Sequence, residues 1–305
     1  MSEEPWLDPP LPEPKGERRT SGAWRCSLAA RARGDQLIGT AVPARRWFLV
    51  GHRGPWARSA IATPPLSDIA RDLDRALGRA SARLQLIRRH GRVSGDAPDE
   101  EQPVALVDSV SGRVRWDTWR EPEDLLRLAA TFEDLPEEDP EPIVVVCAHG
   151  KKDVCCAIEG RLVTGVLNDV MPDAVWETTH LGGDRFAGNL ALLPEGSMYG
   201  EVLGSNATDL VMGHVDGTVD LAHWRGRSIW TSPAQVVVAE VVRAGVPLAA
   251  VRSAVATPDG ADRWVVEVVA DGATTTRVVT RTLSPPRRLT CSTETKQAAI
   301  YHLDD

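Results

Sequence analysis

The feature that most constrains this chain is the segment 142–170, which changes from a strand pattern to a helix pattern across a cysteine-rich loop. Residues 143–146 read IVVV, a β-branched run typical of a buried parallel strand. From 158 to 170 apolar side chains recur at helical spacing. The loop between them holds three cysteines, Cys147, Cys155 and Cys156. We therefore expect these thiols at the C-terminal edge of a sheet and near a helix N-terminus, where anionic ligands are favoured.

A second segment is predicted to converge on these thiols. Residues 174–180 form a strand candidate that ends at His180, and Gly182 and Gly183 follow it. Paired glycines allow a tight reversal at positive φ, which would bring Asp184 back towards His180. The resulting C-x8-C and H-x3-D spacing departs from the closely paired cysteines of structural zinc sites. It is a better match to a two-iron cluster held from two loops, in which nitrogen ligands replace thiolates on one iron.

Charge and proline content divide the chain into regions. Residues 133–142 hold six acidic residues and three prolines with no basic residue, and are the predicted linker. The α/β domain predicted at 21–132 carries a net charge of +5, and the metal-binding domain predicted at 143–245 carries −5. Opposite charges favour docking of the two domains; the alternative is that both charged faces are solvated. Residues 1–20 are predicted to be a disordered tail, and 246–305 a β-rich extension.

The spacing of apolar residues predicts the other strands and helices. Strands are expected at 37–42, 46–52, 83–89, 103–109 and 112–119, and helices at 66–80, 122–132, 156–170 and 232–245. Trp56 lies in the loop after the second strand. One interpretation is that it lines a binding groove with Arg53 and Arg58; the favoured one is that it packs against the other half of the chain.

Composition excludes several classes of protein. With 305 residues, 42% of them hydrophobic and 26% charged, the chain can bury a real core. A net charge of −8 argues against nucleic-acid binding, and no apolar run is long enough for a membrane span or a signal peptide. A cytoplasmic protein is expected. Five cysteines, an odd number, favour metal or redox chemistry over a disulfide framework.

Several segments of this sequence resemble the sucrase/ferredoxin-like family. The resemblance rests on the cysteine loop at 147–162, on HLGGDRFAGN at 180–189 and on stretches of the first domain, and it covers roughly residues 22–245. It implies a thioredoxin-like ferredoxin fold for the second lobe and a [2Fe-2S] cluster. Fungal relatives use two cysteines and two histidines as ligands. Carried across, these positions are Cys147, Cys156, His180 and Asp184.

The fourth position departs from the family pattern, because it is aspartate instead of histidine. A carboxylate is a harder ligand than a thiolate and is uncommon on such clusters, so Asp184 is expected either to ligate or to hydrogen-bond to a ligand. Cys155 and Cys291 are the alternative fourth ligands. Cys155 is disfavoured because adjacent helical residues point about 100° apart. His149 is expected either to tune the cluster or to be an ordinary loop residue.

The predicted function is one-electron transfer by a [2Fe-2S] carrier. No flavin or nicotinamide motif is present, so the partners expected are a separate reductase and a separate acceptor protein, with no nucleic acid and no membrane. The oligomeric state stays open. One alternative is a thioredoxin-fold thiol-redox enzyme using Cys155 and Cys156, although the usual C-x-x-C is absent. A glycoside hydrolase, suggested only by the family label, would need two suitably spaced carboxylates.

Overall fold

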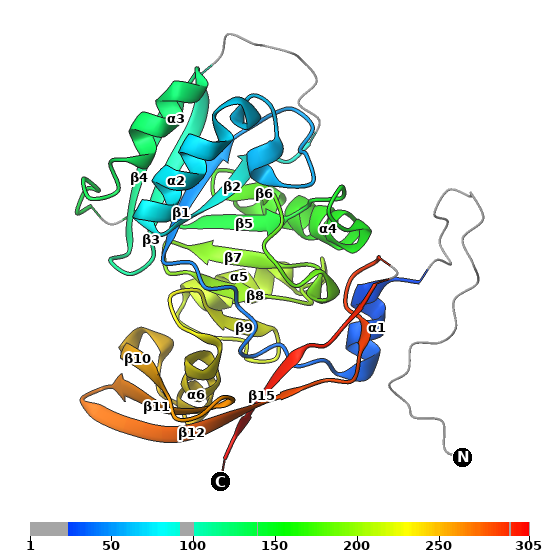
Figure 1. The fold of residues 1–305 in the computed structure, drawn as a ribbon, viewed down its shortest axis with the longest axis vertical. Helices are drawn as coiled ribbons and strands as arrows, with labels where there is room; N and C mark the ends of the chain where they lie inside the picture. Colours follow the sequence, from blue (N-terminus) through cyan, green and yellow to red (C-terminus); the bar gives the residue numbers. More distant parts are fainter. Residues whose placement is uncertain (1–23, 92–100, 139, 293, 305) are drawn as a thin grey trace.

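A single mixed sheet runs through both halves of the chain. The computed structural model describes residues 24–91, 101–138, 140–292 and 294–304, so the predicted tail at 1–20 lies outside it. In these ranges nine strands pair in the order β4-β3-β1-β2-β6-β5-β7-β8-β9 (Figure 1). The predicted α/β class is confirmed, and the two lobes share this sheet instead of building one each.

The first half of the sheet combines a parallel pair with an antiparallel hairpin. Its strands are β1 (Arg46–Gly51), β2 (Ala82–Arg88), β3 (Gln102–Asp108) and β4 (Arg113–Trp119). β1 and β2 are parallel, β3 lies antiparallel beside β1, and β4 pairs with β3. Two helices, α2 (Ala70–Ala80) and α3 (Pro122–Ala129), pack against each other and bury their leucines in the core of this half. The helix expected at 66–80 is α-helical only from Ala70, because its first turn, η2 (Leu66–Ile69), is a 3-10 helix.

The second half repeats this arrangement. Its strands are β5 (Ile143–Cys147), β6 (Val175–Thr178), β7 (Leu190–Leu193) and β8 (Ser197–Tyr199), with β9 (Trp224–Arg227) added at the edge. β5 and β6 are parallel and joined through α4 (Val154–Val170), while β7 and β8 are an antiparallel pair with β7 beside β5. The order β6-β5-β7-β8 with these directions is that of the thioredoxin core. The order β2-β1-β3-β4 of the first half is the same, so the chain contains two units of this topology.

The two halves meet where β2 and β6 pair antiparallel, with Arg88 opposite Glu177. These two side chains also form an ion pair at 2.8 Å between Nη2 and Oε2. Trp56 is buried and its ring meets that of His149 edge-on, with centroids 5.7 Å apart. The predicted packing of Trp56 against the other half is therefore confirmed.

A separate antiparallel sheet covers one side of the second half. It consists of β10 (Val251–Pro258), β11 (Arg263–Ala270), β12 (Ala273–Leu283) and β15 (Ala299–Leu303). Helix α6 (Ser232–Arg243), at the position expected for the helix 232–245, packs on this sheet and shares one hydrophobic core with it. The β-rich C-terminal segment is confirmed. Its last part, with β13 (Arg287–Arg288) and β14 (Thr295–Lys296), returns beside α1 (Cys26–Arg33) at the N-terminal end of the described chain (Figure 1).

The strand predicted at 37–42 is wrong, because this segment is a loop. Gly39 has φ +86°, and the amides of Gly39, Thr40 and Ala41 all point to the carbonyl oxygen of Arg225 in β9. Three amides that converge on one acceptor cannot form a ladder with a neighbouring strand.

The segment 133–142, predicted to be the linker, connects α3 to β5 in irregular conformation where it is described. Leu135 within it is buried in the core of the first half. None of the helices in the described ranges has the length and apolar character needed to cross a membrane.

Candidate metal centre

Cys147 and Cys156 are brought together by the close packing of α4 on β5. Cys147 is the last residue of β5, and Cys156 lies in the first turn of α4. Asp153 caps this helix, since its Oδ1 accepts a hydrogen bond of 2.9 Å from the Cys155 amide. A Cβ atom on Gly160 would lie 2.0 Å from the carbonyl oxygen of Cys147. Glycine at 160 is therefore what allows the helix to approach the strand so closely.

The loop after β6 supplies the histidine and the aspartate. The strand ends at Thr178, two residues before the predicted end, so His180 lies in the loop itself. Gly182 and Gly183 have φ of +93° and +77°, as the predicted reversal requires. His180 Nδ1 lies 3.0 Å from Asp184 Oδ1. The reversal brings the two side chains together, as predicted from the sequence.

The two loops converge on one point. The ligand atoms of Cys147, Cys156 and His180 all lie within 4.8 Å of one another. Asp184 borders this group, and its Oδ1 accepts a 3.6 Å hydrogen bond from Cys156 Sγ. The side chain of His180 is 22% exposed, whereas both cysteines and Asp184 are buried. The four residues therefore form one site whose imidazole is its most solvent-accessible part.

Two arginines, the buried Arg225 and the half-buried Arg83, hold the glycine loop. Arg225 donates to the Gly182 carbonyl oxygen (2.9 Å) and to Asn189 Oδ1 (2.7 Å). Arg83, from the first half, donates to the His180 carbonyl oxygen at 3.0 Å. Burial lowers the pKa of Arg225 to about 9 and that of Arg83 to about 10. Both remain cations at neutral pH and favour thiolate beside them. Neither arginine is predictable from the sequence, because they come from distant strands and no local pattern marks them.

The two thiols of this site titrate in opposite directions. A hydrogen bond from Cys156 and the proximity of His180 hold the pKa of Cys147 well below its ordinary value, against the effect of burial. The same hydrogen bond, together with burial, raises the pKa of Cys156. Burial also raises the pKa of Asp184.

The other two candidates for the fourth ligand lie elsewhere. Cys155 Sγ is 3.4 Å from Cys291 Sγ, and both belong to a separate group with Cys26 and Asp153. Cys155 and Cys156 thus serve different sides of the first turn of α4, as their helical positions require. Both thiols are buried. This geometry does not favour the thiol-redox alternative, which needs the two sulfurs together and accessible.

His149 belongs to the contact between the two halves. Its Nε2 lies 2.8 Å from the carbonyl oxygen of Ala57, and its ring packs against Trp56. Burial lowers the pKa of this imidazole, so it is neutral at pH 7. Its contacts are those of a packing residue.

The family model described as sucrase/ferredoxin-like matches residues 37–226. A curated relative, altered inheritance of mitochondria protein 32 from the yeast Meyerozyma guilliermondii, is 29% identical over 111 residues. That match covers 33% of this chain and 38% of the relative. Among solved structures, a variant of the thioredoxin-like [2Fe-2S] ferredoxin from Aquifex aeolicus aligns at a TM-score of 0.26 with 16% identity, covering 28% of this chain and 100% of the ferredoxin. Because the family model spans more than half of its length, the chain belongs to the sucrase/ferredoxin-like family.

Proposed function

We propose that this protein is a one-electron carrier with a [2Fe-2S] cluster held by Cys147, Cys156, His180 and Asp184. The observation that carries the proposal is the convergence of two buried thiols, at the end of β5 and the start of α4, with a partly exposed imidazole from the loop after β6. Membership of the family agrees with it.

The donor set fits such a cluster chemically. Soft thiolates are the usual ligands of iron-sulfur clusters, and imidazole replaces thiolate in clusters of higher potential. The three donor atoms within 4.8 Å of one another are also close enough to hold a single ion. Analysis of the iron and sulfide content distinguishes a [2Fe-2S] cluster from a single metal ion.

The residues around the site have separate roles in this proposal. Cys147 and Cys156 hold the cluster away from water, and Arg83 and Arg225 place two positive charges beside their thiolates. Positive charge stabilises an anionic site. His180 provides the ligand nearest to solvent, and therefore the edge at which a partner protein exchanges the electron.

Asp184 is proposed as the fourth ligand. It is the carboxylate in contact with both Cys156 and His180. A cluster with a histidine ligand is expected to have a reduction potential above that of all-cysteine plant-type ferredoxins. The electron donor and acceptor are proposed to be separate proteins, and the cytoplasm is proposed as the compartment on composition alone.

The test is an absorption spectrum of freshly purified protein with iron and sulfide analysis. We expect a coloured protein with about two irons and two sulfides per chain. A colourless chain after anaerobic reconstitution, or one holding a single ion at this site, would contradict the proposal.

A further inference from the structure

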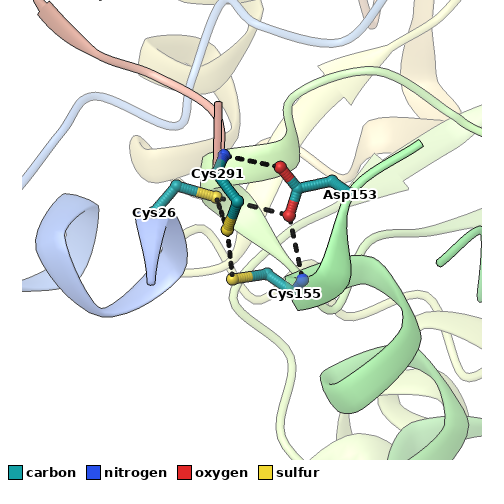
Figure 2. Close-up of side chains that lie close together, drawn as sticks. All are labelled: Cys26, Asp153, Cys155 and Cys291. Carbon is teal, nitrogen blue, oxygen red and sulfur yellow. Dashed lines mark hydrogen bonds between the residues drawn. The ribbon is translucent and has the colours of Figure 1, made fainter. Parts of the chain in front are cut away.

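We infer that the chain binds a second metal ion, a structural zinc, through Cys26, Cys155, Cys291 and Asp153. Figure 2 shows these side chains converging from three segments: helix α1, the start of α4 and the turn after β13. The three sulfurs and a carboxylate oxygen all lie within 4.8 Å of one another. This site is separate from the proposed cluster, and the inference does not rest on that cluster.

The distances fit a tetrahedral ion. With zinc bonds of about 2.3 Å to sulfur and 2.1 Å to oxygen, a tetrahedron places two sulfurs about 3.8 Å apart and a sulfur and an oxygen about 3.6 Å apart. Cys155 and Cys291 have their Sγ atoms 3.4 Å apart, and Cys291 and Cys26 have theirs 3.6 Å apart. Cys26 Sγ is 3.7 Å from Asp153 Oδ1. The side chains therefore need only small movements to bind the ion.

The chemistry also favours zinc. Three thiolates are the soft donors that structural zinc takes, and a carboxylate oxygen is a harder ligand that zinc also accepts. All three thiols are buried, and Ala187, Trp24 and Val154 surround them with apolar surface. A disulfide explains this group of three cysteines less well. The Cys155–Cys291 and Cys291–Cys26 Sγ separations are nearly equal, and a disulfide between any two of the cysteines would leave the third as an unpaired buried thiol.

Asp153 is held in place for this role. Its Oδ1 accepts from the Cys155 amide at 2.9 Å, and its Oδ2 accepts from the Cys291 amide at 2.7 Å. Each carboxylate oxygen has a further lone pair for a metal. One side chain thus caps α4, anchors the C-terminal turn and faces the three sulfurs (Figure 2).

The zinc ion would hold α1 in contact with the loop that contains Asp184. Arg31 of α1 donates to the carbonyl oxygen of Ala187 at 2.7 Å. Just beyond the helix, Asp35 forms ion pairs with Arg185 at 3.3 Å and with Arg287 at 3.1 Å. The α1 segment therefore contacts the loop that contains Asp184, and the segment around Arg287, far away in sequence, is joined to it through Asp35. A metal that joins them limits local opening there.

The experiment counts zinc and iron separately in the full chain. Anaerobically purified wild-type protein should hold one zinc per chain, independent of its iron content. The Cys147→Ser/Cys156→Ser double variant should lose the iron and keep the zinc. Loaded with Co²⁺ instead, it should show thiolate-to-cobalt charge-transfer bands and the spectrum of a tetrahedral ion.

Adding Cys291→Ser to the double variant should remove the zinc and the cobalt spectrum. Asp153→Asn should lower the zinc retained per chain, because it replaces an anionic ligand with a neutral one. Ser292→Ala, an exposed change in the same turn, should leave the metal content unchanged.

Three results would overturn the inference: wild-type protein without zinc, zinc retained after Cys291→Ser, or a Cys155 to Cys291 disulfide found by mass spectrometry in protein without zinc. Absence of zinc from the wild-type protein overturns the inference even where a variant fails to fold. If wild-type protein holds no iron and the Cys147→Ser/Cys156→Ser double variant still holds one zinc, this site stands and the proposed electron carrier does not.

Discussion

The two cysteine groups of this protein are built in different ways from neighbouring residues of one helix. Cys156 faces Cys147 and His180, so its group comes from residues 147–184 within a single thioredoxin-like unit. Cys155, one residue earlier, faces Cys26 and Cys291, which lie near the two ends of the chain. The first group is local to one unit of the fold, whereas the second exists only when distant segments have docked.

This difference predicts different behaviour. A group local to one unit forms when that unit folds, and its ligands are rigidly placed by a strand end and a glycine loop. A group assembled from chain ends depends on loop closure over long distances, which costs conformational entropy until the metal is bound. The second group should therefore be the more sensitive of the two to chelators and to changes near the termini.

The largest effect is expected from changing the two adjacent cysteines one at a time. Cys156→Ser should abolish the visible spectrum and the bound iron and leave the zinc. Cys155→Ser should remove the zinc and leave the visible spectrum and the iron, because each change removes a direct ligand of only one metal centre. Metal analysis of both variants measures this. If Cys155→Ser bleaches the protein and Cys156→Ser does not, the assignment of the two residues is reversed.

Next in size is the effect of Asp184, which borders only the first group. Asp184→Ala should make the cluster labile, and Asp184→His should retain it with a higher midpoint potential, because a neutral ligand makes the cluster less negative and favours its reduction. Redox titration and the rate of bleaching in air measure these effects. A potential unchanged in both variants would remove Asp184 from the site.

A smaller effect, on stability, is expected from Gly160→Ala. The added Cβ would press against the Cys147 carbonyl oxygen, so α4 and β5 must separate, at a cost of about 1–3 kcal/mol. The change should distort the iron site more than the zinc site. Thermal unfolding measures the loss of stability, and metal analysis measures the effect on each site. Gly165→Ala in the same helix is the control, since its Cβ would lie 3.5 Å from His90 Nε2, an ordinary contact. Equal destabilisation in the two variants would show that close packing at 160 is unimportant.

The smallest effect is expected from His149→Phe. The change removes one hydrogen bond to Ala57 and keeps the ring that packs on Trp56, so stability should fall by about 1 kcal/mol. Metal content and midpoint potential should stay as in the wild type. A shifted potential would show that His149 tunes the cluster instead of joining the two halves.

Much of the first group was predictable from the sequence because its determinants are local. The β-branched run before Cys147, the helical spacing after Cys156 and the glycine pair between His180 and Asp184 each specify a backbone conformation within a few residues. Local propensity and steric limits are readable at that range. The predictions of an α/β fold, a β-rich C-terminal segment and convergence of the two loops rested on such signals. The strand predicted at 37–42 failed because its amides bond to the carbonyl of Arg225, which no local pattern indicates.

The tertiary structure alone decided what depends on distant partners. The sequence could place Cys155 and Cys156 on different sides of a helix, but it could not say that Cys26 and Cys291 meet Cys155 there. Arg83 and Arg225 support the glycine loop from strands far away in the chain. The pairing of β2 with β6, which joins the two halves, is likewise a contact between distant segments. Such contacts are selected by the burial and hydrogen bonding of the folded whole, and they leave no periodicity in the sequence from which to predict them.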